Sequence, residues 1–205
     1  MLRTIIILCT AIFLLPAGCR SRKNPAIRYY TIELPAGNYV SFDNNSTPLT
    51  SYTCEVEKAE VNQAFSSHRI ANRQGSNELV YYAYHQWAVR PGDILTAVNE
   101  SFFQKAGIFE SVFNRSFELN PDYKLKCVVN RIETIETDKV LKAHLQMELF
   151  LTENKSSNVV MYHSADQSRP MTQNSINDFA AVISEMYGDQ LSQAAEKITD
   201  YFSKK

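Results

Sequence analysis

The sequence has no apolar run long enough to cross a membrane as a helix. Its longest apolar block, residues 4–15, spans twelve residues, whereas a transmembrane helix needs roughly 20. The block follows one positive residue, Arg3, and ends at Pro16, which interrupts a helix. A positive residue, a short apolar block and then small residues are typical of a secretory signal peptide. We therefore expect residues 1–18 to be removed from the mature protein.

The cysteine after this segment indicates a lipid anchor. Ala17-Gly18-Cys19 resembles the bacterial lipobox, in which cleavage precedes a cysteine that is diacylated on sulfur and acylated, commonly with palmitate, on its amino group. The match departs from the usual pattern at Pro16, where an aliphatic residue is common. The alternative is an ordinary signal peptide with an incidental cysteine. Three fatty chains on Cys19 would attach the protein stably, because each buried methylene contributes about 0.8 kcal/mol.

The residue after the cysteine predicts the membrane. In the sorting rule of many Gram-negative lipoproteins, aspartate at that position retains the protein in the inner membrane. Arg20 stands there and implies the outer membrane, facing the periplasm. We expect residues 1–18 to be the lipoprotein signal peptide and residues 19–25 the lipidated cysteine with a polar tether. Residues 26–205 form one predicted periplasmic α+β domain. A chain of this length can bury a hydrophobic core without added disulfides or metal ions.

The sequence also lacks an excess of one charge, an abundance of glycine and the common catalytic motifs. Its formal net charge is −1 and it has six glycines, which argues against nucleic acid as a partner and against low-complexity linkers. It has no HExxH, CxxC or GxSxG sequence and no Gly-rich phosphate loop. None of its histidines lies at i, i+4 from another: His68, His85, His144 and His163. We predict no catalytic residue, no metal site and no cofactor, and therefore not an enzyme.

Besides Cys19, the mature chain has two cysteines, Cys54 and Cys127. Both lie in β-rich segments, and the predicted compartment allows disulfides to persist. A bond between them would close a loop of about 70 residues, worth about 4 kcal/mol in the chain-entropy model. Two separate buried thiols agree equally well with the sequence.

The apolar periodicity predicts a mixed helix and strand content. Spacings of three and four residues predict helices over 94–106 and 175–201. Alternating patterns predict a meander of three strands over 123–162, with turns at 138–139 and 154–158. Further β-rich runs lie at 26–34, 52–61, 67–73, 78–87 and 111–117. The predicted fold class is α+β: a mainly antiparallel sheet of about seven or eight strands, covered on one face by two long helices.

Residues 81–87, Tyr-Tyr-Ala-Tyr-His-Gln-Trp, are unusually aromatic. In a regular strand, Tyr82 and Tyr84 face one way while Tyr81, His85 and Trp87 face the other. One set is expected in the core. The other set predicts a contact with a second layer, an exposed interaction patch or a surface for acyl chains, since tyrosine and tryptophan favour interfaces.

The order of segments resembles a known family. A lipobox is followed by "YYTIELP", then by "FSSHRIANRQGSNELVYYAYHQWAVRPGDILTAVNESFFQKAGIFESV", and later by a meander and an amphipathic helix. This is similar to the ABC-type transport auxiliary lipoproteins, the PqiC-like family. In that family an arginine-bearing strand leads into a hairpin, and a tryptophan precedes a proline-containing turn and a helix. The resemblance adds two arginines to the aromatic residues of 81–87. The expected interaction surface consists of Arg69, Arg73, Tyr82, Tyr84 and Trp87.

The resemblance implies a non-enzymatic subunit of a lipid-transport system. Its partners would be an MCE-domain protein and ABC transporter subunits, with membrane lipid held through the acylated cysteine and a ring of identical copies as the assembly. The protein would dock the periplasmic MCE assembly at the outer membrane. A carrier or chaperone with an acyl chain between sheet and helices is the alternative, and it requires a continuous apolar cavity. A hydrolase of envelope polymers would require a cleft with convergent His, Asp or Glu side chains.

Overall fold

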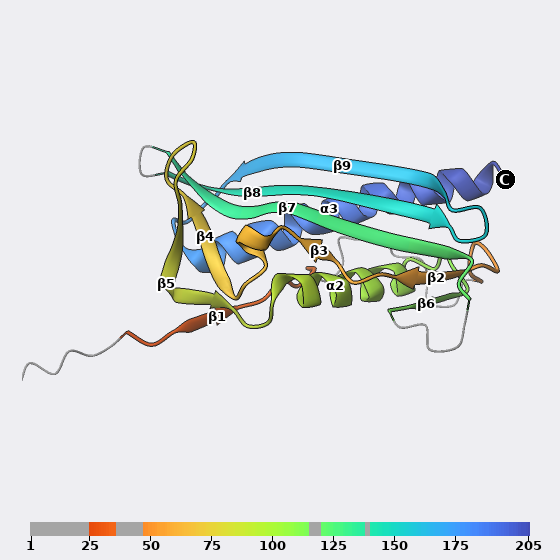
Figure 1. Cartoon of the computed structure of the whole chain (residues 1–205), viewed down its shortest axis with the longest axis horizontal. Helices are drawn as coiled ribbons and strands as arrows, with labels where there is room; N and C mark the ends of the chain where they lie inside the picture. Colours follow the sequence, from red (N-terminus) through yellow and green to blue (C-terminus); the bar gives the residue numbers. More distant parts are fainter. Residues whose placement is uncertain (1–24, 36–46, 115–119, 138–139) are drawn as a thin grey trace, which may run out of the picture.

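The computed structural model describes residues 25–35, 47–114, 120–137 and 140–205 (Figure 1). A meander of three long strands forms the largest part of the fold: β7 (Tyr123–Thr137), β8 (Val140–Glu153) and β9 (Asn158–Pro170). Both pairs in this meander are antiparallel. The strands predicted over 123–162 and the turn around 154–158 are confirmed, and β9 continues beyond the predicted end. The predicted turn at 138–139 lies outside the described residues.

The rest of the sheet is built on the other edge of β7. Three short strands pair with β7 in succession, all parallel to it: β2 (Thr53–Val56), β3 (Glu60–Val61) and β4 (Arg69–Arg73). Next to β4 lies the antiparallel β5 (Leu79–Trp87), which carries the parallel β1 (Arg28–Tyr30). The parallel β6 (Ser111–Phe113) borders β2. The described sheet thus has nine strands and is mixed, so the prediction of a mainly antiparallel sheet is wrong.

Two helices pack on the sheet, α2 (Pro91–Lys105) and α3 (Ile176–Ser203). Both predicted helices are confirmed. Pro91 lies at the first position of α2, where its missing N–H costs nothing. Ser175 caps α3, since its side chain accepts a hydrogen bond of 3.1 Å from the amide of Asp178. In the described residues, neither helix is both long and apolar enough to span a bilayer.

The core lies between the helices and one face of the sheet. Leu125, Cys127 and Val129 on β7 are buried and alternate with partly exposed residues. The Tyr187 hydroxyl of α3 lies 3.3 Å from Cys127 Sγ and donates to Asn99 Oδ1 of α2 at 2.6 Å. Both helices therefore cover the face that carries Cys127.

Candidate functional site

A bulge in β7 places a carboxylate on the sheet face away from the helices. The β7–β8 register runs from Val129 opposite Met147 to Arg131 opposite Gln146, which leaves one extra residue on β7. Such an insertion reverses the alternation of side chains along the strand. Ile132 therefore continues the buried helix-side row, and Glu133 faces the opposite side. Without the bulge, Glu133 would point into the apolar core.

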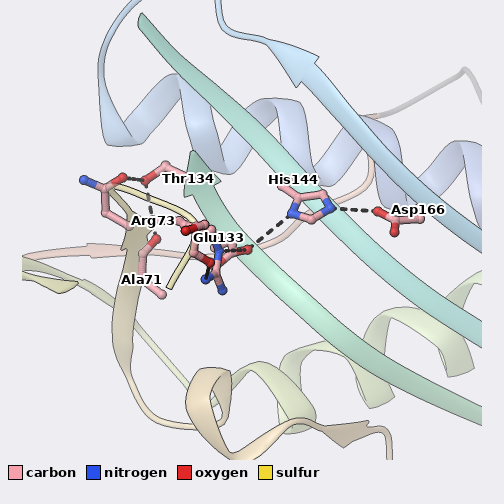
Figure 2. A network of polar contacts seen from close by, with 8 residues as sticks. Ala71, Arg73, Glu133, Thr134, His144 and Asp166 are labelled. Carbon is pink, nitrogen blue, oxygen red and sulfur yellow. Dashed lines mark hydrogen bonds and ion pairs between the residues drawn. The ribbon is translucent and has the colours of Figure 1, made fainter. Parts of the chain in front are cut away.

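Glu133 joins a network of charged side chains from four strands (Figure 2). Arg73 of β4 donates from Nε to Glu133 Oε1 at 2.9 Å. His144 of β8 lies directly opposite Glu133, with Nδ1 3.3 Å from the same oxygen. Its other nitrogen, Nε2, lies 2.7 Å from Asp166 Oδ1 of β9. We call Arg73, Glu133, His144 and Asp166 the charged network.

The charged network is self-neutralising, and its pKa shifts follow from its contacts. Hydrogen bonding to Glu133, together with Asp166, raises the pKa of His144 and outweighs the effect of burial. Burial opposes ionisation of Glu133, but hydrogen bonds from His144 and Arg73 prevail and lower its carboxyl pKa. The hydrogen bond to Glu133 raises the pKa of Arg73. The contacts therefore favour the protonated forms of His144 and Arg73 and the ionised form of Glu133.

The chemistry of this network is structural. Each ring nitrogen of His144 faces a carboxylate, so neither is directed at a hydroxyl or thiol that a general base could activate. The raised pKa of His144 also favours the protonated imidazole over the neutral form that a general base requires. Within the part of the chain that the structure describes, no group of three or more His, Cys, Asp or Glu side chains could hold a metal ion. The contacts tie β4 to β7, β8 and β9 across the sheet.

The predicted arginines lie on this same face. Arg69 and Arg73 are four residues apart on β4. Because side chains alternate between the two faces of a strand, both lie on the face away from the helices. The Arg69 guanidinium lies 4.3 Å from the centroid of the Tyr81 ring, a cation–π contact. The Tyr81 hydroxyl donates to the carbonyl of Ala64 at 2.9 Å, which holds the η1 turn (Gln63–Phe65) nearby.

The predicted aromatic residues do not share a surface. The β4–β5 register slips between Arg69 opposite Gln86 and Ala71 opposite Tyr81, so the alternation predicted for residues 81–87 is broken. The Tyr82 hydroxyl lies 3.2 Å from Thr134 Oγ1, on the opposite side of the sheet from Glu133. Tyr84 is 46% exposed.

Trp87 was predicted as part of the surface, and the structure overturns that prediction. Its side chain is 1% exposed and its ring centroid lies 5.8 Å from that of Phe179 in α3. The irregular register turns the end of β5 toward the helices, so the tryptophan fills the core. Of the other four residues of the expected surface, Arg69 and Tyr84 are exposed, whereas Arg73 and Tyr82 are partly buried.

Cys54 and Cys127 are both free and buried, so the disulfide alternative is not formed. In the β2–β7 register Cys54 lies opposite Tyr123, and Cys127 is four residues further along β7, about 13 Å away. A disulfide needs Cα atoms within about 7 Å. Burial raises the pKa of Cys54, and it raises that of Cys127 to about 11. Cys19, the predicted lipidation site, lies outside the described residues.

Sequence reasoning missed the charged network. Of its members it considered Arg73 as a surface residue and noted only that His144 has no partner at i, i+4. Glu133 and Asp166 carry no sequence signal, because their contacts depend on a bulge and on the register of three strand pairs.

Comparison with known proteins gives a match over most of the chain. Residues 38–198 match the model of a protein family described as "ABC-type transport auxiliary lipoprotein component". No curated protein matches. The solved structures include protein XCC0632 from Xanthomonas campestris, assigned to DUF330, at 22% identity and a TM-score of 0.64. That match covers 87% of this chain and 99% of the other.

Two further solved structures extend the comparison. An uncharacterized protein matches with a TM-score of 0.64 at 12% identity, over 85% of this chain and 99% of that one. The PelC dodecamer from Paraburkholderia phytofirmans reaches a TM-score of 0.42 at 14% identity, over 75% of this chain and 92% of that one. At these identities, XCC0632 and the uncharacterized protein share the fold with this chain and show no more than that. The PelC likeness is weaker still.

Proposed function

The chain belongs to the family of ABC-type transport auxiliary lipoprotein components, and from this premise we propose that it is a docking or adaptor subunit of an ABC/MCE-type lipid transport system. It is anchored through Cys19 in the outer membrane and faces the periplasm. Its partners are an MCE-domain protein and ABC transporter subunits, and copies of the chain assemble as a ring. The observation that carries the proposal is the family match, which spans 38–198.

The structure supports a docking role through the sheet face away from the helices. The charged network fixes β4, β7, β8 and β9 relative to one another on that face. Arg69 lies beside it and is exposed, stacked on Tyr81. A rigid face with a positioned arginine suits recognition of a partner, because little conformational entropy is lost on binding.

The alternative role, a carrier with an acyl chain between sheet and helices, has less support. On the sheet, Leu145, Met147 and Leu149 are fully buried. Opposite them, Ile183 and Tyr187 of α3 are fully buried as well. Side chains therefore occupy the space that a carrier of this kind would keep open.

Crosslinked affinity purification of the lipidated protein from its native envelope tests the proposal. Mass spectrometry of proteins and lipids should identify an MCE-domain protein or ABC subunits with the wild-type chain. The variant Arg69→Glu should recover severalfold less partner, whereas Lys204→Glu, at the far C-terminal end, should match the wild type. Recovery of lipid without an MCE-domain protein or ABC subunits would contradict docking. Light scattering of the solubilised protein tests the ring.

A further inference from the structure

A groove of about 570 Å³ lies outside the sheet–helix core, between residues 31–35 and α2. We call it the α2 groove. Its apolar walls come from Ile32 and Leu34 on one side and from Ile94, Val98 and Phe102 on the other. Ile32 is itself buried, and the amide of Glu33 donates to Ser184 Oγ of α3 at 3.2 Å. These contacts hold residues 31–35 in place, so the groove has two fixed walls.

The groove extends along most of α2. Its lining residues on α2 run from Asp93 to Lys105, a distance of about 18 Å at the rise of an α-helix. Ala97 and Ser101, four residues apart on α2, also line the groove, and their small side chains leave space beside the helix. The charged residues of the lining are Glu33, Asp93 and Lys105, and Asp93 is paired with Lys58, whose Nζ lies 2.6 Å from its carboxylate. A single extended acyl chain has this length and polarity.

One end of the groove opens beside exposed apolar and basic side chains. Val89, in the groove wall, is 48% exposed, and Ile27 and Tyr29 are 45% and 62% exposed. The amide of Ala88 donates to the carbonyl of Tyr30 at 2.7 Å, which brings the segment after β5 alongside β1. Arg28 and Arg90 are exposed in the same two segments. Exposed apolar side chains flanked by arginine complement an anionic membrane surface.

The tether places this end of the groove near the membrane. Ile27 is eight residues after Cys19, so the chain between them spans at most about 28 Å. We propose that the α2 groove takes one acyl chain of an anionic phospholipid from the anchoring membrane, with Arg28 and Arg90 near the lipid phosphate. This inference rests on the membrane anchoring proposed above and is independent of docking to a transporter.

Photocrosslinking in vesicles tests the inference. The lipidated protein is incorporated into vesicles of phosphatidylethanolamine and phosphatidylglycerol that contain a phosphatidylglycerol with a diazirine in one acyl chain. After irradiation, mass spectrometry locates the crosslinked residues. We expect crosslinks at Val98 and Phe102, inside the groove. Crosslinks confined to Ile27, Tyr29 and Val89 would show surface association alone and would overturn the inference, as would the absence of crosslinks.

Matched variants separate groove occupancy from attachment. Ala97→Trp should lower the crosslinking yield about tenfold or more, because exclusion of two methylenes from apolar contact has that effect. Gln193→Trp, at an exposed position of α3 outside the groove lining, should leave the yield unchanged. Arg28→Gln combined with Arg90→Gln should lower the yield with phosphatidylglycerol present and not in vesicles of phosphatidylethanolamine with a neutral diazirine lipid. An unchanged yield for Ala97→Trp would refute the assignment. The vesicles contain no transporter, so failure of the docking proposal cannot produce these results.

Discussion

His144 Nε2 of β8 lies 2.7 Å from Asp166 Oδ1 of β9. The two strands are antiparallel, and their register places His144 and Asp166 diagonally across from each other rather than directly opposite. The imidazole is buried, and the aspartate side chain is largely exposed. The pair therefore connects the buried end of the charged network to solvent, and the protonation of His144 should affect the stability of the fold.

Stability should depend on pH through His144. Its pKa is raised above the ordinary value of 6.5, so its contribution is complete below pH 6.5 and is lost as the pH rises through the folded value. Urea unfolding should therefore show a larger loss of stability for His144→Asn at pH 5.5 than at pH 8.5. His163 provides the control with opposite sign, because burial lowers its pKa. An equal loss for His144→Asn at both pH values would contradict this prediction.

Removal of the Glu133 charge should be costly. Glu133→Gln leaves Arg73 and His144 without their shared anion, and loss of one partner from a buried ion pair costs about 3 kcal/mol. Its lowered pKa means that the contribution is present above pH 4.5 and is lost as the pH falls through the folded value. Urea unfolding at pH 7 measures the change. Glu60→Gln, in the exposed pair with Lys126, should not change stability measurably.

Trp87 should contribute to stability and not to recognition. Trp87→Ala should lower the free energy of unfolding by about 4 kcal/mol, because it opens a cavity against Phe179. Tyr84→Ala, at an exposed position of the same strand, should change it by less than about 0.5 kcal/mol. Denaturant titration followed by circular dichroism measures both. Similar losses for the two variants would contradict the burial of Trp87.

Cys54 and Cys127 should remain as thiols. In a chain with Cys9 and Cys19 replaced by serine, a thiol reagent should label neither cysteine in the folded protein and both after denaturation, because both are buried. Reducing agent should leave the unfolding midpoint unchanged. An intact mass that rises by two hydrogens on reduction would reveal a disulfide and a different register of β2 on β7.

Cys19 should carry the lipid. Mass spectrometry of the N-terminal peptide from the native envelope should find a diacylglyceryl group on sulfur and an acyl chain on the amino group. Cys19→Ser should release the protein from the membrane fraction, since the anchor depends on the buried chains. An unmodified cysteine in a membrane-bound protein would remove the anchor from the proposed function.

Features that depend on local periodicity could be predicted from the sequence. The helices at 94–106 and 175–201 followed from apolar residues at helical spacing, and both formed as α2 and α3. The long meander followed from period-two alternation around turn residues. Helical spacing and strand alternation are patterns among residues a few positions apart in the sequence. Such patterns can be recognised without knowledge of the tertiary structure.

Strand direction and register were decided only by the tertiary structure. A short strand has the same apolar pattern whether its neighbour is parallel or antiparallel. The parallel pairing of β2, β3 and β4 with β7 therefore had no sequence signal. The register kept Cys54 from Cys127, and its slip in β5 turned Trp87 into the core. One extra residue in β7 placed Glu133 beside His144. Side chains alternate between faces, so a shift of one residue reverses which of them meet, and only long-range packing selects the shift.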